Sequence, residues 1–192
     1  PDISCNLSRI EYFVNNNKFF NELSKNKYIL NEVNKLMGEE SLLFKDKINL
    51  KYPNSHGFGT HQDSAALWNK YSNKIITIGI TLYDLNTDNG CLYFSNKLEK
   101  QVTKNLKSLD GLNLNYKPEL LKSGDLLLFD CFIPHMSYSN KSKLYSPVIY
   151  FSYIPKSEGD FYQIYHYDKF KNNPPDIYKE TDKEYPSNNV FV

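Results

Sequence analysis

The segment IITIGITLYDLNTDNGCLYF, Ile75 to Phe94, decides the fold class. Two short apolar runs, IITIGITLY (75–83) and CLYF (91–94), lie on either side of the polar turn NTDNG, which contains Asn-Gly. β-branched and aromatic residues favour strands, and Asn-Gly favours a tight turn between strands. The segment therefore predicts antiparallel β-structure.

The chain on both sides of this segment carries further short strand patterns. Ile48, Leu50 and Tyr52 alternate with polar residues, DLLLF (125–129) follows a Ser-Gly turn, and VIYFSYI (148–154) follows a proline. No helical pattern separates these runs. This arrangement favours an antiparallel sandwich or barrel over a parallel sheet.

The N-terminal part has a different periodicity. From about Ile10 to Leu36 apolar residues recur at helical spacing, with a break near residues 15–18, and Gly38 follows at the position of a helix C-cap. We therefore expect a single domain in three parts, which are helical N-terminal residues of about 8–38, a β-core of about 42–154, and an extended segment or lid of about 155–192.

Composition limits the classes of function. The chain has 192 residues, a formal net charge of +1 and 23% charged residues, which favours neither nucleic acid nor an anionic membrane as a partner. The three cysteines, Cys5, Cys91 and Cys131, form no C-x-x-C pair, which is typical of a reducing, cytoplasmic compartment. Arg9 is the only arginine, and the chain begins at Pro1, as expected of a processed chain or a piece of a longer one.

The motif THQD places His61 two residues before Asp63. On an extended backbone, side chains at i and i+2 point to the same face, so both could bind one ion. His135, which follows the apolar run GDLLLFD, could supply a third ligand from a distant strand. Two histidines and one carboxylate are the ligand set of non-haem Fe(II) oxygenases. The motif taken alone fits an ordinary polar loop as well.

Longer segments add a family resemblance. THQD (60–63), ITLYDLNTDNGCLYF (80–94) and SGDLLLFDCFIPHMSYSNKS (123–142) resemble the phytanoyl-CoA dioxygenase family of Fe(II)/2-oxoglutarate-dependent oxygenases. The resemblance covers about residues 42–153 and includes the tail segment DKFKNNPPDIYKE (168–180). It implies a mainly β fold with N-terminal helices, namely a double-stranded β-helix (jelly roll, cupin-like).

The resemblance also implies roles for individual residues. His61, Asp63 and His135 match the iron ligands, and Ser137 and Lys51 match groups near a carboxylate of 2-oxoglutarate. Trp68 matches an aromatic residue that lines the substrate pocket. The implied cofactors are Fe(II), the cosubstrate 2-oxoglutarate and dioxygen.

The implied reaction is the oxidation, most simply the hydroxylation, of an unactivated C–H bond in a small molecule, either free or carrier-bound. Succinate and carbon dioxide are the by-products. Because related halogenases have a small residue in place of the carboxylate, Asp63 favours hydroxylation, or a desaturation or cyclisation begun in the same way.

The sequence departs from the family at one position. The family has an arginine eleven residues after the distal histidine, where it pairs with the far carboxylate of 2-oxoglutarate, and this chain has Ser146. A hydroxyl does not replace a bidentate guanidinium. Lys51, Lys141 or Lys143 could supply the charge, or the cosubstrate could bind in another pose. The alternatives are a non-catalytic scaffold with a remnant metal site and an iron enzyme that does not use 2-oxoglutarate.

Three other reactive residues have simpler interpretations. His56 lies in the turn-rich stretch PNSHGFG and is expected in a loop. His166 lies in the aromatic run FYQIYHYDKF and is expected to be packed or on the surface. Cys131 is expected to be a buried thiol rather than a metal ligand.

Overall fold

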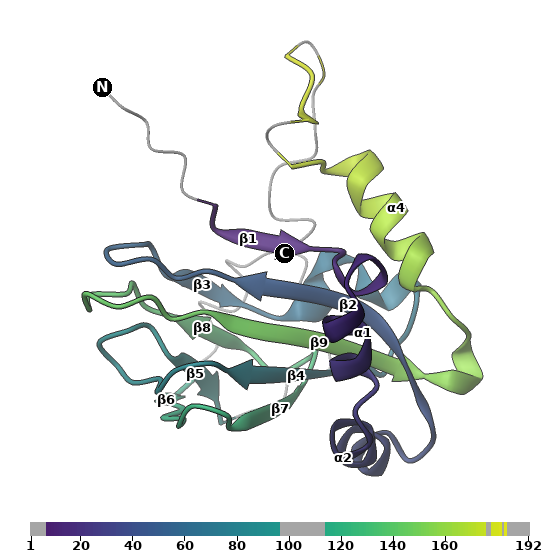
Figure 1. Ribbon diagram of the computed structural model, residues 1–192, viewed down its shortest axis with the longest axis horizontal. Coiled ribbons are helices and arrows are strands. Elements are labelled where there is room, and N and C mark those ends of the chain that lie inside the picture. Colours follow the sequence, from purple (N-terminus) through teal and green to yellow (C-terminus); the bar gives the residue numbers. More distant parts are fainter. Residues whose placement is uncertain (1–6, 97–113, 176–177, 182, 184–192) are drawn as a thin grey trace.

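The computed structural model describes residues 7–96, 114–175, 178–181 and 183. Two antiparallel sheets pack face to face, helices α1 and α2 cover the larger sheet, and α4 lies near its β1 edge (Figure 1). The larger sheet has the order β1 (Arg9–Glu11), β2 (Ser41–Asn49), β9 (Val148–Pro155), β4 (Ile76–Thr81), β7 (Leu126–Asp130). The smaller has the order β3 (Phe58–His61), β8 (His135–Ser137), β5 (Leu92–Ser95), β6 (Tyr116–Pro118).

The described helices are α1 (Lys18–Ser24), α2 (Lys27–Met37) and α4 (Tyr162–Asn172), with short 3₁₀ turns η1 (Val14–Asn16), η2 (Asp63–Ala66), η3 (Trp68–Lys70) and η4 (Lys156–Glu158). Asn26 caps α2 by accepting a hydrogen bond from the Tyr28 N–H. Gly38 ends the helix at φ 80°, a left-handed conformation that glycine adopts without strain. The predicted cap at Gly38 matches the structure, whereas the break between the two helices lies at Lys25 and Asn26 rather than near residues 15–18.

Strand β9 lies at the centre of the fold. All eight of its residues are buried. Ile149, Phe151 and Tyr153 pack against the N-terminal helices, whereas Val148 and Tyr150 point between the two sheets. Because both faces are covered, this strand is a continuous apolar run rather than an alternating one.

The predicted antiparallel β-fold is confirmed, but the decisive segment folds differently from a simple hairpin. Strand β4 pairs with β7 and β9, while β5 pairs with β6 and β8 in the other sheet. The NTDNG turn therefore carries the chain from one sheet to the other. Asn89 stabilises this corner, since its Oδ1 accepts from the Asn86 N–H at 2.8 Å and its Nδ2 donates to the Asp84 carbonyl at 2.7 Å.

The N-terminal part predicted as helical, residues 8–38, begins instead with strand β1. Arg9 pairs with Asn49 and Glu11 with Lys47 at the edge of the larger sheet. Arg9 and Glu11 therefore share one face, and Ile10 points to the other. A run of three residues is too short to show a period, so its partner strand decides its structure.

The tail, residues 155–192, also differs from the extended segment that the sequence predicted, because it contains helix α4. Tyr162, Tyr165, His166 and Lys169 are its buried residues, spaced as on one helical face. Two of these four residues are polar, which hid the pattern in the sequence. Its role as a lid stays a prediction.

Cys91 and Cys131 are free and buried, and Cys5 lies outside the described residues. In the part of the chain that the structure describes, no helix has the length and hydrophobicity needed to cross a membrane.

Candidate metal centre

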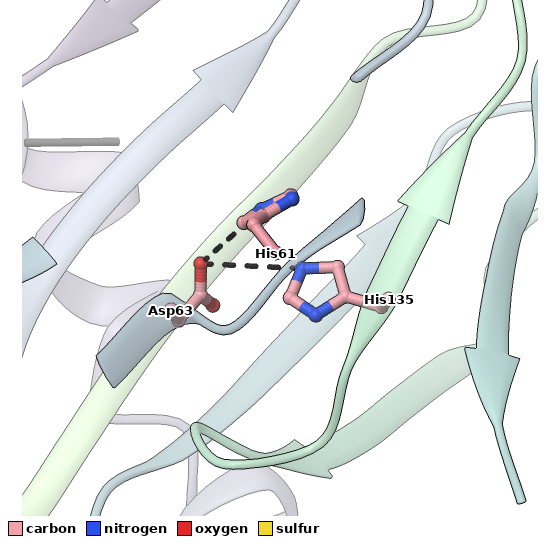
Figure 2. Close-up of side chains that lie close together, drawn as sticks. All are labelled: His61, Asp63 and His135. Carbon is pink, nitrogen blue, oxygen red and sulfur yellow. Dashed lines mark ion pairs between the residues drawn. The ribbon is translucent and has the colours of Figure 1, made fainter. Parts of the chain in front are cut away.

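Three side chains from different elements meet between the sheets. His61 ends β3, Asp63 begins η2 and His135 begins β8 (Figure 2). His61 and His135 are directly paired across β3 and β8, and their ring centroids lie 4.2 Å apart. The structure thus brings together the three residues that the sequence proposed as ligands.

Backbone contacts hold the two halves of this centre together. The Ser64 N–H donates to the Cys131 carbonyl at 3.1 Å, and the Gln62 side chain donates to the Phe132 carbonyl at 2.7 Å. These bonds tie the segment after His61 to the loop that leads into His135. The ligand positions are therefore fixed without a metal.

Each imidazole is oriented through one nitrogen. His61 Nδ1 lies 2.8 Å from the Gly59 carbonyl oxygen, and His135 Nδ1 lies 3.0 Å from the Ile133 carbonyl oxygen. A carbonyl only accepts, so both Nδ1 atoms carry the proton and both Nε2 atoms present a lone pair. Carbonyl acceptors of this kind commonly orient metal-binding histidines.

The Asp63 carboxylate points at these lone pairs. Its Oδ1 lies 3.9 Å from His61 Nε2 and 4.0 Å from His135 Nε2, and it is buried without a hydrogen-bond partner. One donor atom from each residue lies within 4.8 Å of the others, and all three residues are buried. A buried carboxylate oxygen facing two lone pairs is unfavourable unless a cation lies between them, so these residues fit a metal ion.

The electrostatics favour the protonation states that a metal needs. Burial, reinforced by His135, lowers the pKa of His61 to about 3 against the opposing effects of Asp63 and the Gly59 carbonyl. Burial also lowers the pKa of His135. Burial alone would raise the pKa of Asp63, but Lys47 and the two histidines lower it to about 2. At neutral pH the site presents two neutral imidazoles and one carboxylate.

A pocket opens beside the metal centre and encloses about 340 Å³ of empty space, including its opening to solvent. Its walls combine apolar and cationic side chains. The residues that line it are Arg9, Lys47, Asn49, Phe58, His61, Asp63, Leu92, Phe129, His135 and Tyr150. Phe94 and Phe129 also pack against the His135 ring, with centroids 5.5 Å and 5.2 Å away.

Arg9, Lys47 and Asn49 were not recognised from the sequence as site residues. A signal was present, because Lys47 and Asn49 alternate with apolar residues on a strand and would share one face. Hydrophobicity alone predicts that such a charged face is exposed to solvent. The structure turns it toward the interior and places the single arginine of the chain opposite Asn49.

The residues that line the pocket do not include the other proposed site residues, Lys51, Ser137 and Trp68. Lys51 is buried, and its ammonium donates to the Gly90 carbonyl at 2.6 Å. The Ser137 hydroxyl accepts from the Phe58 N–H at 3.2 Å. Trp68 is 1% exposed in the core beside Phe44, donates to the Tyr165 hydroxyl, and is not among the residues that line the pocket.

The position of the family arginine is buried as well. Ser146 is 0% exposed, and its hydroxyl has no hydrogen-bond partner. Its N–H donates to the Lys51 carbonyl at 3.0 Å, which continues the register that pairs Asn49 with Val148. Lys51 and Ser146 are therefore neighbours on the same face of the sheet, whereas Lys141 and Lys143 are exposed.

The remaining reactive residues lie outside the centre. His56 is exposed. His166 lies on α4, where its Nε2 is 3.1 Å from Asp46 Oδ1. Burial raises the pKa of the Cys131 thiol, so this residue is an inert part of the core.

Comparison with known proteins supports this description. The chain is 32% identical over 188 residues to the 2-aminoethylphosphonate dioxygenase of uncultured bacterium HF130_AEPn_1, covering 94% of this chain and 71% of that protein. It is 32% identical over 140 residues to the methylphosphonate hydroxylase of Gimesia maris, covering 70% of this chain and 53% of that protein. The chain thus spans only about half of the second relative.

Solved structures agree on the fold. EctD from S. alaskensis, solved with 2-oxoglutarate and 5-hydroxyectoine, has a TM-score of 0.69 and 18% identity, covering 79% of this chain and 57% of EctD. The non-haem α-ketoglutarate-dependent epimerase SnoN from nogalamycin biosynthesis has a TM-score of 0.65 and 16% identity, covering 77% of this chain and 60% of SnoN. The phytanoyl-CoA dioxygenase (PhyH) family model matches residues 9–145, well over half of the sequence, and the chain belongs to that family.

Proposed function

We propose that the protein is a non-haem Fe(II)- and 2-oxoglutarate-dependent dioxygenase that hydroxylates a C–H bond of a small molecule. The observation that carries the proposal is the buried Asp63 oxygen facing the lone pairs of His61 and His135. Three ligands on one side of an ion leave positions for a cosubstrate and dioxygen. The names of the two relatives, a dioxygenase and a hydroxylase, support the same reaction class.

The overall reaction balances with one cosubstrate per turnover. Fe(II), when bound, would supply the activation of dioxygen. One oxygen atom would enter the substrate C–H bond as a hydroxyl. The other would enter succinate as 2-oxoglutarate loses carbon dioxide. The protein itself has three tasks. It fixes the ligands, keeps water from the reacting centre and orients two small molecules.

Ligand fixing and water exclusion follow from the described contacts. The carbonyls of Gly59 and Ile133 hold the two imidazole rings through Nδ1, so both rings are oriented before a metal binds. Phe58, Leu92 and Phe129 form apolar walls beside the centre. Such walls exclude water and strengthen the electrostatic interactions within the pocket.

Lys51 would supply the positive charge for the far carboxylate of 2-oxoglutarate. Its carbonyl accepts from the N–H of Ser146, the position from which the family arginine acts, and the unpartnered Ser146 hydroxyl could add a hydrogen bond. Burial lowers the pKa of Lys51 to about 8, so the ammonium stays largely protonated at neutral pH. Ser137, which follows His135 by two residues on β8, would contact the same cosubstrate.

Anaerobic titration of the Fe(II)-loaded chain with 2-oxoglutarate tests this proposal. Chelation of the metal by the keto acid is expected to produce a weak visible charge-transfer band that saturates. The Asp63→Ala variant serves as the control and should give no band. Iron binding without a band would contradict the use of 2-oxoglutarate and favour an iron enzyme of another kind or a scaffold. Failure to bind iron would contradict the metal centre.

A further inference from the structure

The inner face of strands β1 and β2 is charged, which is unusual for the interior of a β-sandwich. Lys45, Lys47 and Asn49 alternate along β2, and Arg9 and Glu11 stand opposite Asn49 and Lys47 on β1. Arg9, Lys47 and Asn49 all line the pocket beside the metal centre. Asp63, a metal ligand, is the one acid among the described residues of that lining.

Arg9 has hydrogen-bonding capacity to spare. Its guanidinium lies 3.6 Å from Glu11 and 5.9 Å from the centre of the Phe58 ring. Both Glu11 carboxylate oxygens already accept from Lys169, at 2.5 Å and 2.7 Å. Within the described part of the chain the Arg9 guanidinium makes no hydrogen bond, so its donors remain available at a pocket mouth where the side chain is 25% exposed.

Lys47 and Asn49 also have hydrogen-bonding capacity that the described residues do not use. Lys47 is 8% exposed, lies 5.1 Å from the centre of the Tyr150 ring, and forms no hydrogen bond with the described residues. Asn49 is 8% exposed, and its Oδ1 is buried without a partner. An anion in this pocket could accept from the Lys47 ammonium and from the Asn49 amide, whose NH2 group would have to turn toward it in place of Oδ1.

We propose that Arg9, Lys47 and Asn49 form the binding site for the acidic group of the substrate, and that this group is a phosphonate. The inference rests on the proposed oxygenase function and assigns the substrate side of the same pocket. A guanidinium fork, an ammonium and an amide can together meet the three oxygens of a tetrahedral dianion. A carboxylate carries a single negative charge, whereas the two charges of a phosphonate dianion match the two cations of this site.

The site is distinct from the one proposed for the cosubstrate. Lys51 lies beside Ser146, and its ammonium donates to the Gly90 carbonyl, whereas Arg9 lies on the edge strand. Both cations lie near the Phe58 ring, with Lys51 Nζ 5.8 Å and Arg9 Cζ 5.9 Å from its centre. Lys51 is therefore assigned to 2-oxoglutarate and Arg9 to the acidic group of the substrate. Lys47 and Asn49 belong with Arg9.

The test uses the full chain loaded with Fe(II) and saturated with 2-oxoglutarate in the absence of oxygen. Calorimetric titration with 2-aminoethylphosphonate, β-alanine and ethylamine compares a phosphonate, a carboxylate and no acid on the same carbon skeleton. We expect 2-aminoethylphosphonate to bind most tightly. Arg9→Met and Lys47→Met should each weaken its binding by about 10- to 100-fold. The affinity for ethylamine should be the same in these variants as in the wild type.

Matched variants separate this inference from the proposed function. Lys51→Met should weaken 2-oxoglutarate instead, and the exposed Lys143→Met should change neither affinity. Arg9→Lys should recover part of the lost phosphonate affinity, since it keeps the charge but not the fork.

Several results would overturn the assignment. If Arg9→Met and Lys47→Met both bind the phosphonate as tightly as the wild type, the assignment of these residues is wrong. If β-alanine binds more tightly than 2-aminoethylphosphonate, the assignment of a phosphonate is wrong. Loss of 2-oxoglutarate affinity in Lys47→Met, with phosphonate affinity unchanged, would reassign the site to the cosubstrate. Because metal and cosubstrate binding are measured first, failure of the proposed function would be visible as loss of those signals in the wild type.

Discussion

At the scale of single residues, two buried carboxylates of this chain have opposite environments. Asp46 accepts from the N–H groups of Phe13 and Val14 and from the Tyr162 hydroxyl, and it pairs with His166. Asp63 Oδ1 has no hydrogen-bond partner. A carboxylate that stabilises the fold is satisfied by the protein, whereas one that binds a metal is left for the ion.

This contrast gives a paired prediction. Asp63→Ala should weaken Fe(II) binding at least about 100-fold while leaving the free energy of unfolding of the metal-free protein unchanged or raised, because it removes an unsatisfied group. Asp46→Ala should lower that free energy by about 3–5 kcal/mol and leave Fe(II) affinity unchanged. Urea unfolding and metal titration of both variants measure the two effects. Equal destabilisation by both substitutions would contradict the distinction.

Ser146 allows a second test at this scale. Ser146→Arg alone should lower the free energy of unfolding by about 1–3 kcal/mol through crowding, because the new cation lies beside buried Lys51. The double variant Lys51→Ser, Ser146→Arg should recover stability and bind 2-oxoglutarate through the arginine. Lys51→Ser alone should bind 2-oxoglutarate about 10- to 100-fold more weakly than the wild type. Unchanged 2-oxoglutarate affinity in Lys51→Ser would show that another group holds the carboxylate.

At the scale of elements, the N-terminal strand and the C-terminal helix are joined by one carboxylate. Glu11 on β1 binds Lys169 on α4 and lies 3.9 Å from Lys45 on β2. Burial alone would raise the pKa of Glu11, but Lys45, Lys169 and Arg9 lower it to about 2. Strand β1 and helix α4 therefore meet at the wall that carries Arg9, which explains why neither segment could be understood from its own sequence.

The attachment of β1 to α4 through Glu11 and Lys169 should weaken in acid. A carboxyl whose pKa is lower in the folded state stabilises the protein above its ordinary pKa of 4.5, and this contribution is lost as the pH falls toward 2. The wild type should therefore exceed Glu11→Gln in free energy of unfolding by up to about 3 kcal/mol at pH 7, and the difference should shrink between pH 4.5 and 2. Urea unfolding across that range measures it.

Glu32→Gln provides the control for this pH series. Glu32 pairs with Lys35 on the surface of α2, with half of its side chain exposed. Its substitution should change the free energy of unfolding by less than about 0.5 kcal/mol at every pH. A difference between wild type and Glu11→Gln that stays constant from pH 7 to 2 would contradict the proposed attachment.

At the scale of the whole molecule, the metal centre connects two strands of the smaller sheet, β3 and β8, with the 3₁₀ turn η2 (Figure 2). A metal that binds only the folded chain stabilises it by mass action. At a free metal concentration of 100 times Kd the gain is about 2.7 kcal/mol, and for a chain of this size it should raise the Tm by about 5–10 °C.

Thermal unfolding with and without a chelator measures this shift. Asp63→Ala should unfold at the same temperature in both conditions, because its centre no longer holds the metal. A chelator effect of equal size in Asp63→Ala would place the stabilising metal elsewhere in the protein.

The sequence by itself determined the elements with strong local signals. Continuous β-branched and aromatic runs predict strands wherever they occur, as in VIYFSYI, and Gly38 ends a helix because only glycine adopts its φ without strain. The three proposed metal ligands could also be named, because H-x-D and a histidine after a strand combine a short spacing with a recognisable segment order. Each of these signals is contained in a few neighbouring residues.

The tertiary structure alone decided the rest. Strand β1 exists because β2 offers it hydrogen bonds, and α4 buries tyrosines and a lysine that no hydrophobic pattern would assign to a core. The direction of the charged face of β2 depends on which sheet covers it, so Arg9, Lys47 and Asn49 could not be placed at the pocket from sequence. Contacts between residues far apart in the chain carry no local signal, and the pocket wall that contains Arg9, Lys47 and Asn49 is built from such contacts.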